Sequence, residues 1–295
     1  AVPVLGGVAR DQGLHMPERH LGLVTAEERP LEEAFLQRLA DHVERGIDLD
    51  SLLSRLPEMT LASRAEEGPL DDPPTRVRIG VARDAAFCFY YPDNLDLLCA
   101  AGARLVPFSP VSDACLPDDL DGIYLGGGYP ELHAGRLAAN ADLRRAIQRH
   151  SRKGMPIYAE CGGFMYLCRE LKDQAGSTYP MCGCFPFQTR MNRKLRTLGY
   201  REIRVEKETL LGGPGVLLRG HEFHYSYLAE GAEASSVDKV YALSGSKGGP
   251  LQPEGYAVQR TLGSYVHLHF GSRPASAAAF VAACGKYRQA CGQRK

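Results

Sequence analysis

The 295-residue sequence has no excess of charge of either sign, no long apolar run and no phosphate-binding loop of the common type. Lysine plus arginine and aspartate plus glutamate both count 35, so no broad electrostatic footprint for nucleic acid or an anionic membrane is expected. No apolar run approaches the roughly 20 residues that a membrane helix needs. A charged and apolar secretory leader pattern is also absent at Ala1. These absences predict no nucleic-acid partner and no membrane partner.

The sequence also lacks a disulfide framework, although it holds nine cysteines. Their number is odd and their spacing follows no scaffold pattern, which favours reduced thiols over secreted disulfides. We therefore expect a cytoplasmic protein. The pattern Gly-x₄-Gly-Lys-Ser/Thr occurs nowhere in the chain, so no P-loop is predicted.

The length is sufficient for one large or two ordinary domains, and the composition divides the chain near residue 66. Before this point, residues 2–8 resemble a buried strand and residues 16–24 a loop that enters a short strand. A four-residue apolar period predicts a helix from Leu31 to about Gly46, and a short helix is expected over Leu49–Leu56. Acids, prolines and a glycine then gather over residues 66–74. We predict one part at 1–56, a linker at 57–75 and a domain at 76–295.

Strands and helices alternate in the predicted domain, which favours an α/β fold with an open, doubly wound and mostly parallel sheet. The later segments are shorter and rich in strand formers, so they could add antiparallel strands. The predicted strands are 77–82, 104–107, 122–125, 155–159, 216–218, 222–227 and 264–270, and the predicted helices are 91–101 and 137–152. Ligands bind at the carboxyl ends of the strands in such sheets.

One of these strand ends carries the most informative residue, Cys161. A short apolar strand reaches this cysteine, and Gly162, Gly163 and a helical pattern follow at once. This order is typical of a nucleophile elbow, in which glycines permit a sharp turn and close backbone approach. The N-terminus of the following helix is expected to lower the thiol pKa and to offer N–H donors to an oxyanion.

A structural role for Cys161 is the alternative, because free cysteines usually behave as small buried hydrophobes. A glycine pair directly after a cysteine at a strand-to-helix switch is much rarer than a buried cysteine. We therefore interpret Cys161 as a nucleophile.

Histidines could supply the base that a nucleophilic thiol needs. His267 and His269 lie two apart in a late apolar strand, so we expect them on one face, where one could activate Cys161. The same pair could equally bind a metal or be two satisfied, half-buried histidines. His221 and His224 form a second candidate pair.

A zinc site is a weaker interpretation of the cysteines near the elbow. Cys182 and Cys184 stand close to Cys168 in sequence, but their spacing does not match the usual paired arrangement of zinc ligands. We predict no metal site.

A second glycine-rich turn, residues 126–128, follows the strand at 122–125. Its backbone N–H groups could hold a phosphate or an oxyanion. The absence of a P-loop lysine favours an oxyanion donor opposite Cys161.

Five motifs in order make the chain similar to the cobyrinic acid a,c-diamide synthase family over essentially its whole length. From about Arg76 onward it resembles the class I glutamine amidotransferase domain of the cobyrinate and cobyric acid synthases. The motifs are residues 16–23, 125–132, 159–167, 219–226 and 265–270.

The resemblance implies that Cys161 attacks the side-chain amide of glutamine, forms a γ-glutamyl thioester and releases ammonia. It implies His267 as the general base and then the acid, with His269 as the less favoured alternative. Gly127, Gly128 and Gly162 are expected to bind the oxyanion or glutamine. Other class I amidotransferases carry a glutamate two residues after the histidine, and His269 occupies that place here. We therefore expect a Cys-His dyad in which another group orients His267.

In the family, an ATP-dependent domain resembling dethiobiotin synthetase uses the ammonia to amidate a corrin ring with Mg²⁺. Residues 1–56 resemble the end of that domain, whose ATP-binding front is not in this sequence. The chain is then a fragment or a natural truncation, or another chain supplies the ATP-binding part. ATP and Mg²⁺ are expected to serve the full enzyme and not to bind this chain through a P-loop.

The expected partners are glutamine, a cobyrinic acid-type corrin and a synthetase portion in cis or in trans, and a homodimer is compatible with the sequence. The alternative acceptors are hydrogenobyrinic acid and nickel sirohydrochlorin. A non-catalytic amidotransferase-like binding module is the alternative from another functional class.

Overall fold

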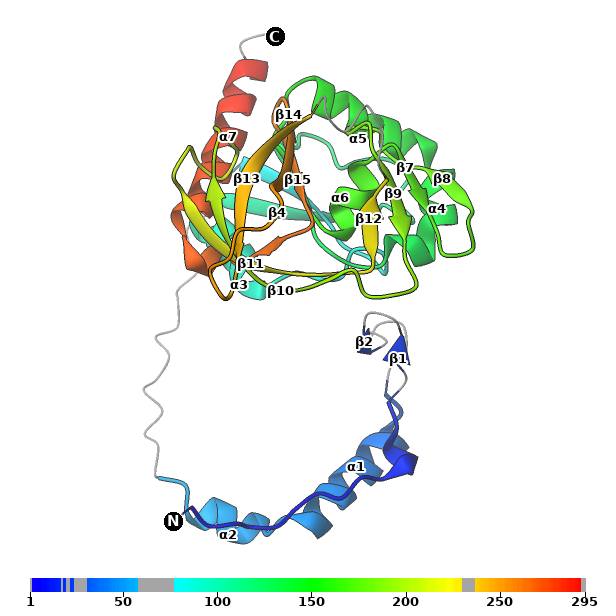
Figure 1. Ribbon diagram of the computed structural model, residues 1–295, viewed down its shortest axis with the longest axis vertical. Helices are drawn as coiled ribbons and strands as arrows, with labels where there is room; N and C mark the ends of the chain where they lie inside the picture. Colours follow the sequence, from blue (N-terminus) through cyan, green and yellow to red (C-terminus); the bar gives the residue numbers. More distant parts are fainter. Residues whose placement is uncertain are drawn as a thin grey trace. The chain divides into compact units, whose positions relative to one another are not determined.

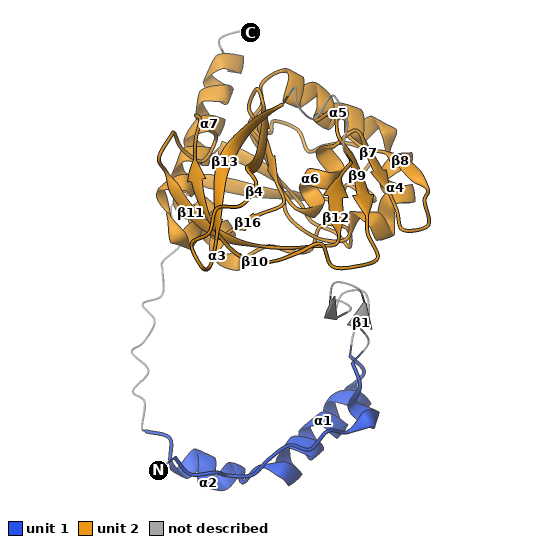
Figure 2. Cartoon of the chain, viewed as in Figure 1, with its two compact units in different colours: residues 1–72 blue, residues 73–295 orange. Residues whose placement is uncertain are grey.

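The computed structural model describes residues 2–16, 18–19, 22–23, 31–57, 77–229 and 237–292. The chain divides into two compact units, residues 1–72 and residues 73–295 (Figure 2). The predicted linker at 57–75 lies outside the described residues, except for its first residue.

The first unit consists of short elements around one longer helix, with bounds η1 Gln12–Leu14, β1 Glu18–Arg19, β2 Gly22–Leu23, α1 Glu33–Gly46 and α2 Leu49–Ser54. The two predicted helices are confirmed within a few residues of their expected ends. Asp48 begins α2 because its carboxylate accepts the Ser51 N–H at 3.0 Å. No described residue of α1 or α2 is buried.

The strand predicted over residues 2–8 is wrong. Val2 and Val4 are 91% and 89% exposed, and the segment forms only an isolated bridge from Gly6 to Ile47. An apolar run needs a neighbouring strand to become part of a sheet, and this segment has none among the described residues.

The second unit is built on a ten-stranded sheet in the order β16-β11-β10-β13-β14-β15-β6-β5-β3-β4 (Figure 1). The strands β15, β6, β5, β3 and β4 run parallel to one another, whereas the other pairs in the sheet are antiparallel. The parallel part has the bounds β3 Val77–Ala82, β4 Ala103–Phe108, β5 Gly122–Leu125, β6 Ile157–Glu160 and β15 Thr261–Ser264. The α/β class is confirmed, and the late strands extend the parallel sheet as antiparallel neighbours.

The antiparallel part of the sheet carries the predicted histidines. Its bounds are β10 Thr197–Val205, β11 Leu217–His224, β13 Asp238–Gly245, β14 Glu254–Val258 and β16 His267–Leu268. A separate four-stranded sheet, β12-β9-β7-β8, lies beside α6 and α4 in the ribbon (Figure 1). Its bounds are β7 Glu170–Lys172, β8 Thr178–Pro180, β9 Gln188–Met191 and β12 Ser226–Leu228.

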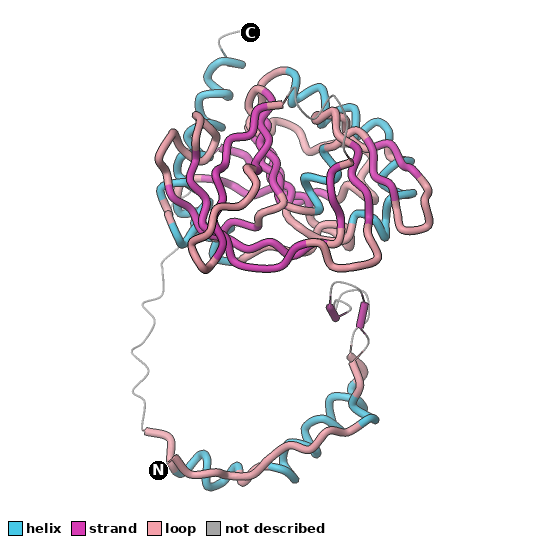
Figure 3. The backbone as a smooth tube through the Cα atoms, in the orientation of Figure 1, coloured by secondary structure: helices cyan, strands magenta, loops and turns pink. Residues whose placement is uncertain are grey.

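Helices flank the ten-stranded sheet (Figure 3). Their bounds are α3 Pro92–Ala100, η2 Pro130–His133, α4 Ala134–Ala139, α5 Ala141–Arg152, α6 Gly162–Leu167, η4 Phe270–Ser272 and α7 Ala275–Gly292. The helix expected over 137–152 is two helices, because Asn140 leaves helical geometry with a ψ of 65°. Its side-chain amide donates instead to the Pro110 and Asp113 carbonyls at 3.0 and 2.8 Å.

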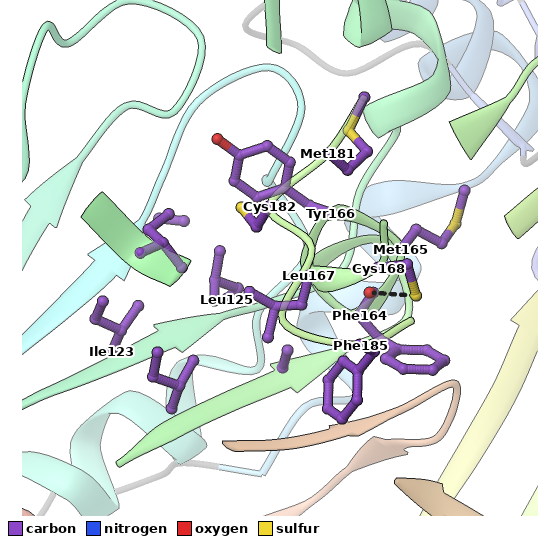
Figure 4. Packing of buried hydrophobic residues seen from close by; sticks show 14 of the residues in the cluster. Ile123, Leu125, Phe164, Met165, Tyr166, Leu167, Cys168, Met181, Cys182 and Phe185 are labelled. Carbon is purple, nitrogen blue, oxygen red and sulfur yellow. Dashed lines mark hydrogen bonds between the residues drawn. The ribbon is translucent and has the colours of Figure 1, made fainter. Parts of the chain in front are cut away.

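Two hydrophobic clusters form the core of this unit. One surrounds α6 and includes Phe164, Met165 and Phe185 (Figure 4), and the other includes Tyr124, Tyr158 and Phe280. Because α6 is buried on every side, its position relative to β5 and β6 is determined by packing. Among the described helices, none has the length and apolar character needed to cross a bilayer.

Candidate active site

Cys161 stands between β6 and α6 with a backbone conformation that side-chain-bearing residues rarely adopt. Its φ is 46° and its ψ is −103°, so the chain turns sharply at this residue. The Cys161 N–H donates to the Ser264 carbonyl at 2.7 Å, and the Met165 N–H donates to the Cys161 carbonyl at 2.9 Å. The thiol therefore stands at the carboxyl end of the parallel sheet, on a turn that is hydrogen-bonded to β15 and to α6.

The two glycines after Cys161 allow the turn to approach the 126–128 loop. A Cβ added at Gly162 would lie 3.0 Å from the Gly128 nitrogen, and one at Gly163 would lie 2.3 Å from the Leu125 carbonyl oxygen. The Gly163 N–H also donates to the Gly126 carbonyl at 2.9 Å. Larger residues at either position would separate the cysteine turn from this loop.

The hydrogen bonds of the 126–128 loop distinguish between its possible oxyanion donors. The Gly127 N–H donates to the Phe89 carbonyl at 3.1 Å, and the Gly126 N–H donates to the Tyr90 hydroxyl at 2.8 Å. The Gly128 N–H has no partner among the described residues, and the Gly162 N–H points to the Cys161 sulfur. The N–H of Gly128 is thus the available donor, whereas the N–H of Gly162 faces the thiol at rest and that of Gly127 is already used.

The structure places His267 against the same loop. A Cβ added at Gly127 would lie only 2.3 Å from the His267 Cε1 atom. The His267 side chain is 4% exposed, and burial lowers its pKa to about 3. The imidazole is therefore neutral at pH 7 and can accept a proton.

The Cys161 thiol is also neutral at rest. It is 6% exposed, and burial, followed by the nearby Glu131 carboxylate, raises its pKa well above the ordinary value. The Gly162 N–H lowers the pKa, but by less than burial raises it. The N-terminus of α6 therefore lowers the thiol pKa as expected, through the Gly162 N–H, but desolvation of the sulfur outweighs this effect.

His269 does not share a strand face with His267, because β16 ends at Leu268. The His269 side chain is 38% exposed, and its Nε2 atom lies 3.4 Å from the Asp93 carboxylate. The expectation that both histidines lie on one strand face is wrong for this reason.

The second histidine pair divides into two different environments. His221 stands opposite His267 in the β11–β16 pair, with the ring centroids 4.8 Å apart. His224 instead shares a 2.8 Å hydrogen bond with the Ser226 carbonyl and stacks on Tyr265 at 4.1 Å. Only His221 contacts the imidazole at the candidate site.

The cysteines of the weaker zinc interpretation belong to the core around α6. Cys168 and Cys182 are buried, and the Cys168 thiol donates to the Phe164 carbonyl at 3.2 Å (Figure 4). Burial raises the pKa of both thiols. No group of three or more metal-binding side chains occurs in the described part of the chain.

Two buried carboxylates support the site, and neither was expected from the sequence to be a site residue. Glu160 accepts the Leu268 N–H at 3.0 Å, and Glu254 accepts the Tyr265 N–H at 2.7 Å. Burial raises the pKa of both to about 7. A glutamate within an apolar strand was the available signal for Glu160.

Comparison with known proteins assigns this arrangement to a family. Residues 78–275 match the CobB/CobQ-like glutamine amidotransferase domain. The chain belongs to this family. The amidotransferase domain thus contains every residue of the candidate site.

The relatives extend the comparison beyond the domain. The chain is 44% identical over 283 residues to a cobyrinate a,c-diamide synthase of Syntrophotalea carbinolica, covering 96% of this chain and 61% of the relative. It is 42% identical to the protein of the same name from Dehalococcoides mccartyi, covering 95% of this chain and 61% of the relative. The chain therefore spans about three fifths of the length of these curated relatives.

A solved structure agrees with the fold. The crystal structure of a candidate GMP synthase protein from Thermoplasma acidophilum superposes with a TM-score of 0.52 at 17% identity, over 75% of this chain and 99% of that protein. This similarity supports the class I amidotransferase fold.

Proposed function

We propose that the amidotransferase domain hydrolyses glutamine through a thioester on Cys161. The observation that carries this proposal is that the strained Cys161 turn and the neutral, buried His267 both contact the 126–128 loop, which offers the Gly128 N–H as a donor. Acyl transfer needs a nucleophile, a base and oxyanion donors close together.

In the proposed reaction, Sγ of Cys161 attacks the amide carbon while His267 accepts the thiol proton. Because both groups are neutral at rest, proton transfer accompanies the attack and does not precede it. The N–H groups of Gly128 and Gly162 stabilise the tetrahedral oxyanion. His267 then returns the proton to the departing nitrogen, ammonia leaves, and water hydrolyses the γ-glutamyl thioester to glutamate and free thiol.

We further propose that the ammonia amidates the a and c carboxylates of cobyrinic acid in cobalamin biosynthesis. The support is the name shared by the relatives, cobyrinate a,c-diamide synthase. The full enzyme would use ATP and Mg²⁺. The sequence contains no P-loop, and the described residues contain no cluster of three metal-binding side chains, so the residues present do not fit these groups. A synthetase portion, in cis or in trans, would hold them.

Glutamate release by the purified chain tests the glutaminase step, with Cys161→Ser as the control. We expect release from the wild type and at least about a 1,000-fold loss in the variant. Labelling by 6-diazo-5-oxo-norleucine should add one adduct, on Cys161. Release that survives the substitution would refute the nucleophile, and an intact protein that neither hydrolyses glutamine nor takes the label would favour a binding module.

The acceptor is tested separately by adding the synthetase portion of a relative. With ATP, Mg²⁺ and glutamine present, cobyrinic acid should be amidated faster than hydrogenobyrinic acid or nickel sirohydrochlorin. A preference for either of the other two would replace the proposed acceptor without changing the glutaminase assignment.

A further inference from the structure

His267 lacks the hydrogen bond that usually orients a catalytic histidine. Its Nδ1 atom is buried and has no partner among the described residues. In a nucleophile-histidine-acid triad a carboxylate accepts from this nitrogen, fixes the ring and stabilises the imidazolium. Another contact must fix the ring here.

The His221 ring covers one face of His267. The two rings are nearly parallel, with an interplanar angle of 12° and centroids 4.8 Å apart. Strand pairing produces this stack, because β11 places His221 directly opposite His267 of β16. Phe89 meets the His267 ring edge-on at 4.9 Å, so two aromatic contacts restrict its rotation.

His221 is itself held in place. The Tyr91 hydroxyl shares a 2.8 Å hydrogen bond with its Nδ1 atom. Burial lowers the pKa of His221, which keeps the ring neutral near pH 7. Because this ring is held by Tyr91, it gives His267 a fixed surface against which to stack.

We propose that His221 is a positioning residue that orients His267 by ring stacking. This inference rests on the proposed glutaminase reaction. In this stack an aromatic ring orients the histidine, as a carboxylate does in a triad. The Tyr91 hydroxyl holds that ring in place.

Two substitutions of His221 distinguish the effect of its aromatic face from the effect of its hydrogen bond to Tyr91. His221→Phe keeps an aromatic face and removes the bond to Tyr91, whereas His221→Asn keeps a polar atom for Tyr91 and removes the face. We expect kcat for glutamine to fall about 30-fold or more in His221→Asn, with KM within about threefold, and to stay within about fivefold of wild type in His221→Phe. His150→Asn is the matched control, because the Nδ1 atom of His150 is also buried without a partner but lies in α5.

NMR of histidine-labelled protein gives a readout that does not need turnover. The His267 ring, identified as the signal missing in His267→Gln, should give one sharp set of resonances in the wild type and in His221→Phe. In His221→Asn the set should broaden or double as the ring samples several orientations, while the thermal midpoint shows that the variant is folded.

Wild-type turnover and a sharp His267 signal in His221→Asn would overturn the proposal, as would equal damage in the Phe and Asn variants. If the wild type releases no glutamate, the glutaminase assignment fails, and the NMR comparison still decides whether the stack orients the ring.

Discussion

The Glu160 carboxylate accepts the backbone N–H of Leu268 at 3.0 Å, so the residue before the candidate nucleophile is bonded to the residue after the candidate base. The Tyr158 and Tyr124 hydroxyls also donate to this carboxylate, at 2.5 and 3.0 Å. Asn94 holds the Leu268 carbonyl through its side-chain amide at 2.7 Å. Both backbone groups of Leu268 are thus held by side chains from other segments, which fixes the position of His267 relative to the cysteine turn.

Removing this carboxylate should weaken both the fold and the site. Glu160→Ala leaves the Leu268 N–H and two tyrosine hydroxyls buried without an acceptor, which should lower the free energy of unfolding by about 3 kcal/mol or more. Glu160→Gln keeps one carbonyl acceptor and should lose about half as much. Urea unfolding measures both, and an alanine variant as stable as the glutamine variant would contradict the role of the bond.

The same carboxylate predicts a pH dependence of stability. Burial raises the pKa of Glu160 to about 7 from an ordinary value of 4.5, so the unfolded chain releases this proton at lower pH than the folded chain does. The contribution to stability is complete below pH 4.5 and is lost as the pH rises to about 7. The stability of the wild type relative to Glu160→Gln should fall by about 3 kcal/mol across this range. A difference that does not change with pH would contradict the raised pKa.

Gly127 should tolerate no side chain. In Gly127→Ala the new Cβ would lie 2.3 Å from the His267 Cε1 atom, so the imidazole must move. We expect glutamate release to fall about 100-fold, because a displacement of about 1 Å costs this much at a reacting group. Gly135→Ala in α4 is the matched control, since its Cβ would meet only Tyr179 at 3.9 Å. Equal activities of the two variants would show that His267 does not need its place beside the loop.

The strained turn at Cys161 predicts a gain in stability at the expense of activity. Glycine adopts a φ of 46° without the steric cost that a side chain incurs there. Cys161→Gly should therefore exceed Cys161→Ala in free energy of unfolding by about 1 kcal/mol, although both variants lose glutaminase activity. Thermal or urea unfolding provides the measurement, and a less stable glycine variant would argue against strain at this turn.

The resting thiol should react slowly with a small alkylating agent. Burial raises the pKa of Cys161, so little thiolate exists at pH 7 and the iodoacetamide rate should rise with pH. The exposed Cys115 should be alkylated first at pH 7, as peptide mass spectrometry can show. Faster reaction of Cys161 than of Cys115 at pH 7 would indicate a thiolate at rest.

Local patterns were sufficient to predict the elbow and most of the strands around it. The strand at Val77–Ala82 has its predicted bounds, and Cys161 stands where a strand, two glycines and a helix meet. These features depend on neighbouring residues, whose spacing and conformational freedom the sequence displays directly. The same local reasoning failed at residues 2–8, because an apolar run does not reveal whether a partner strand exists.

The sequence by itself thus determined the α/β order and the candidate nucleophile, whereas tertiary structure decided how the other groups meet it. The β11–β16 register sets His221 against His267, and Phe89, 38 positions away along the chain, occupies the N–H of Gly127. Glu160 and Leu268 are 108 residues apart and become partners only when β6 and β15 lie side by side. Such contacts follow from strand pairing and burial, which act between distant segments and leave no periodic pattern in the sequence.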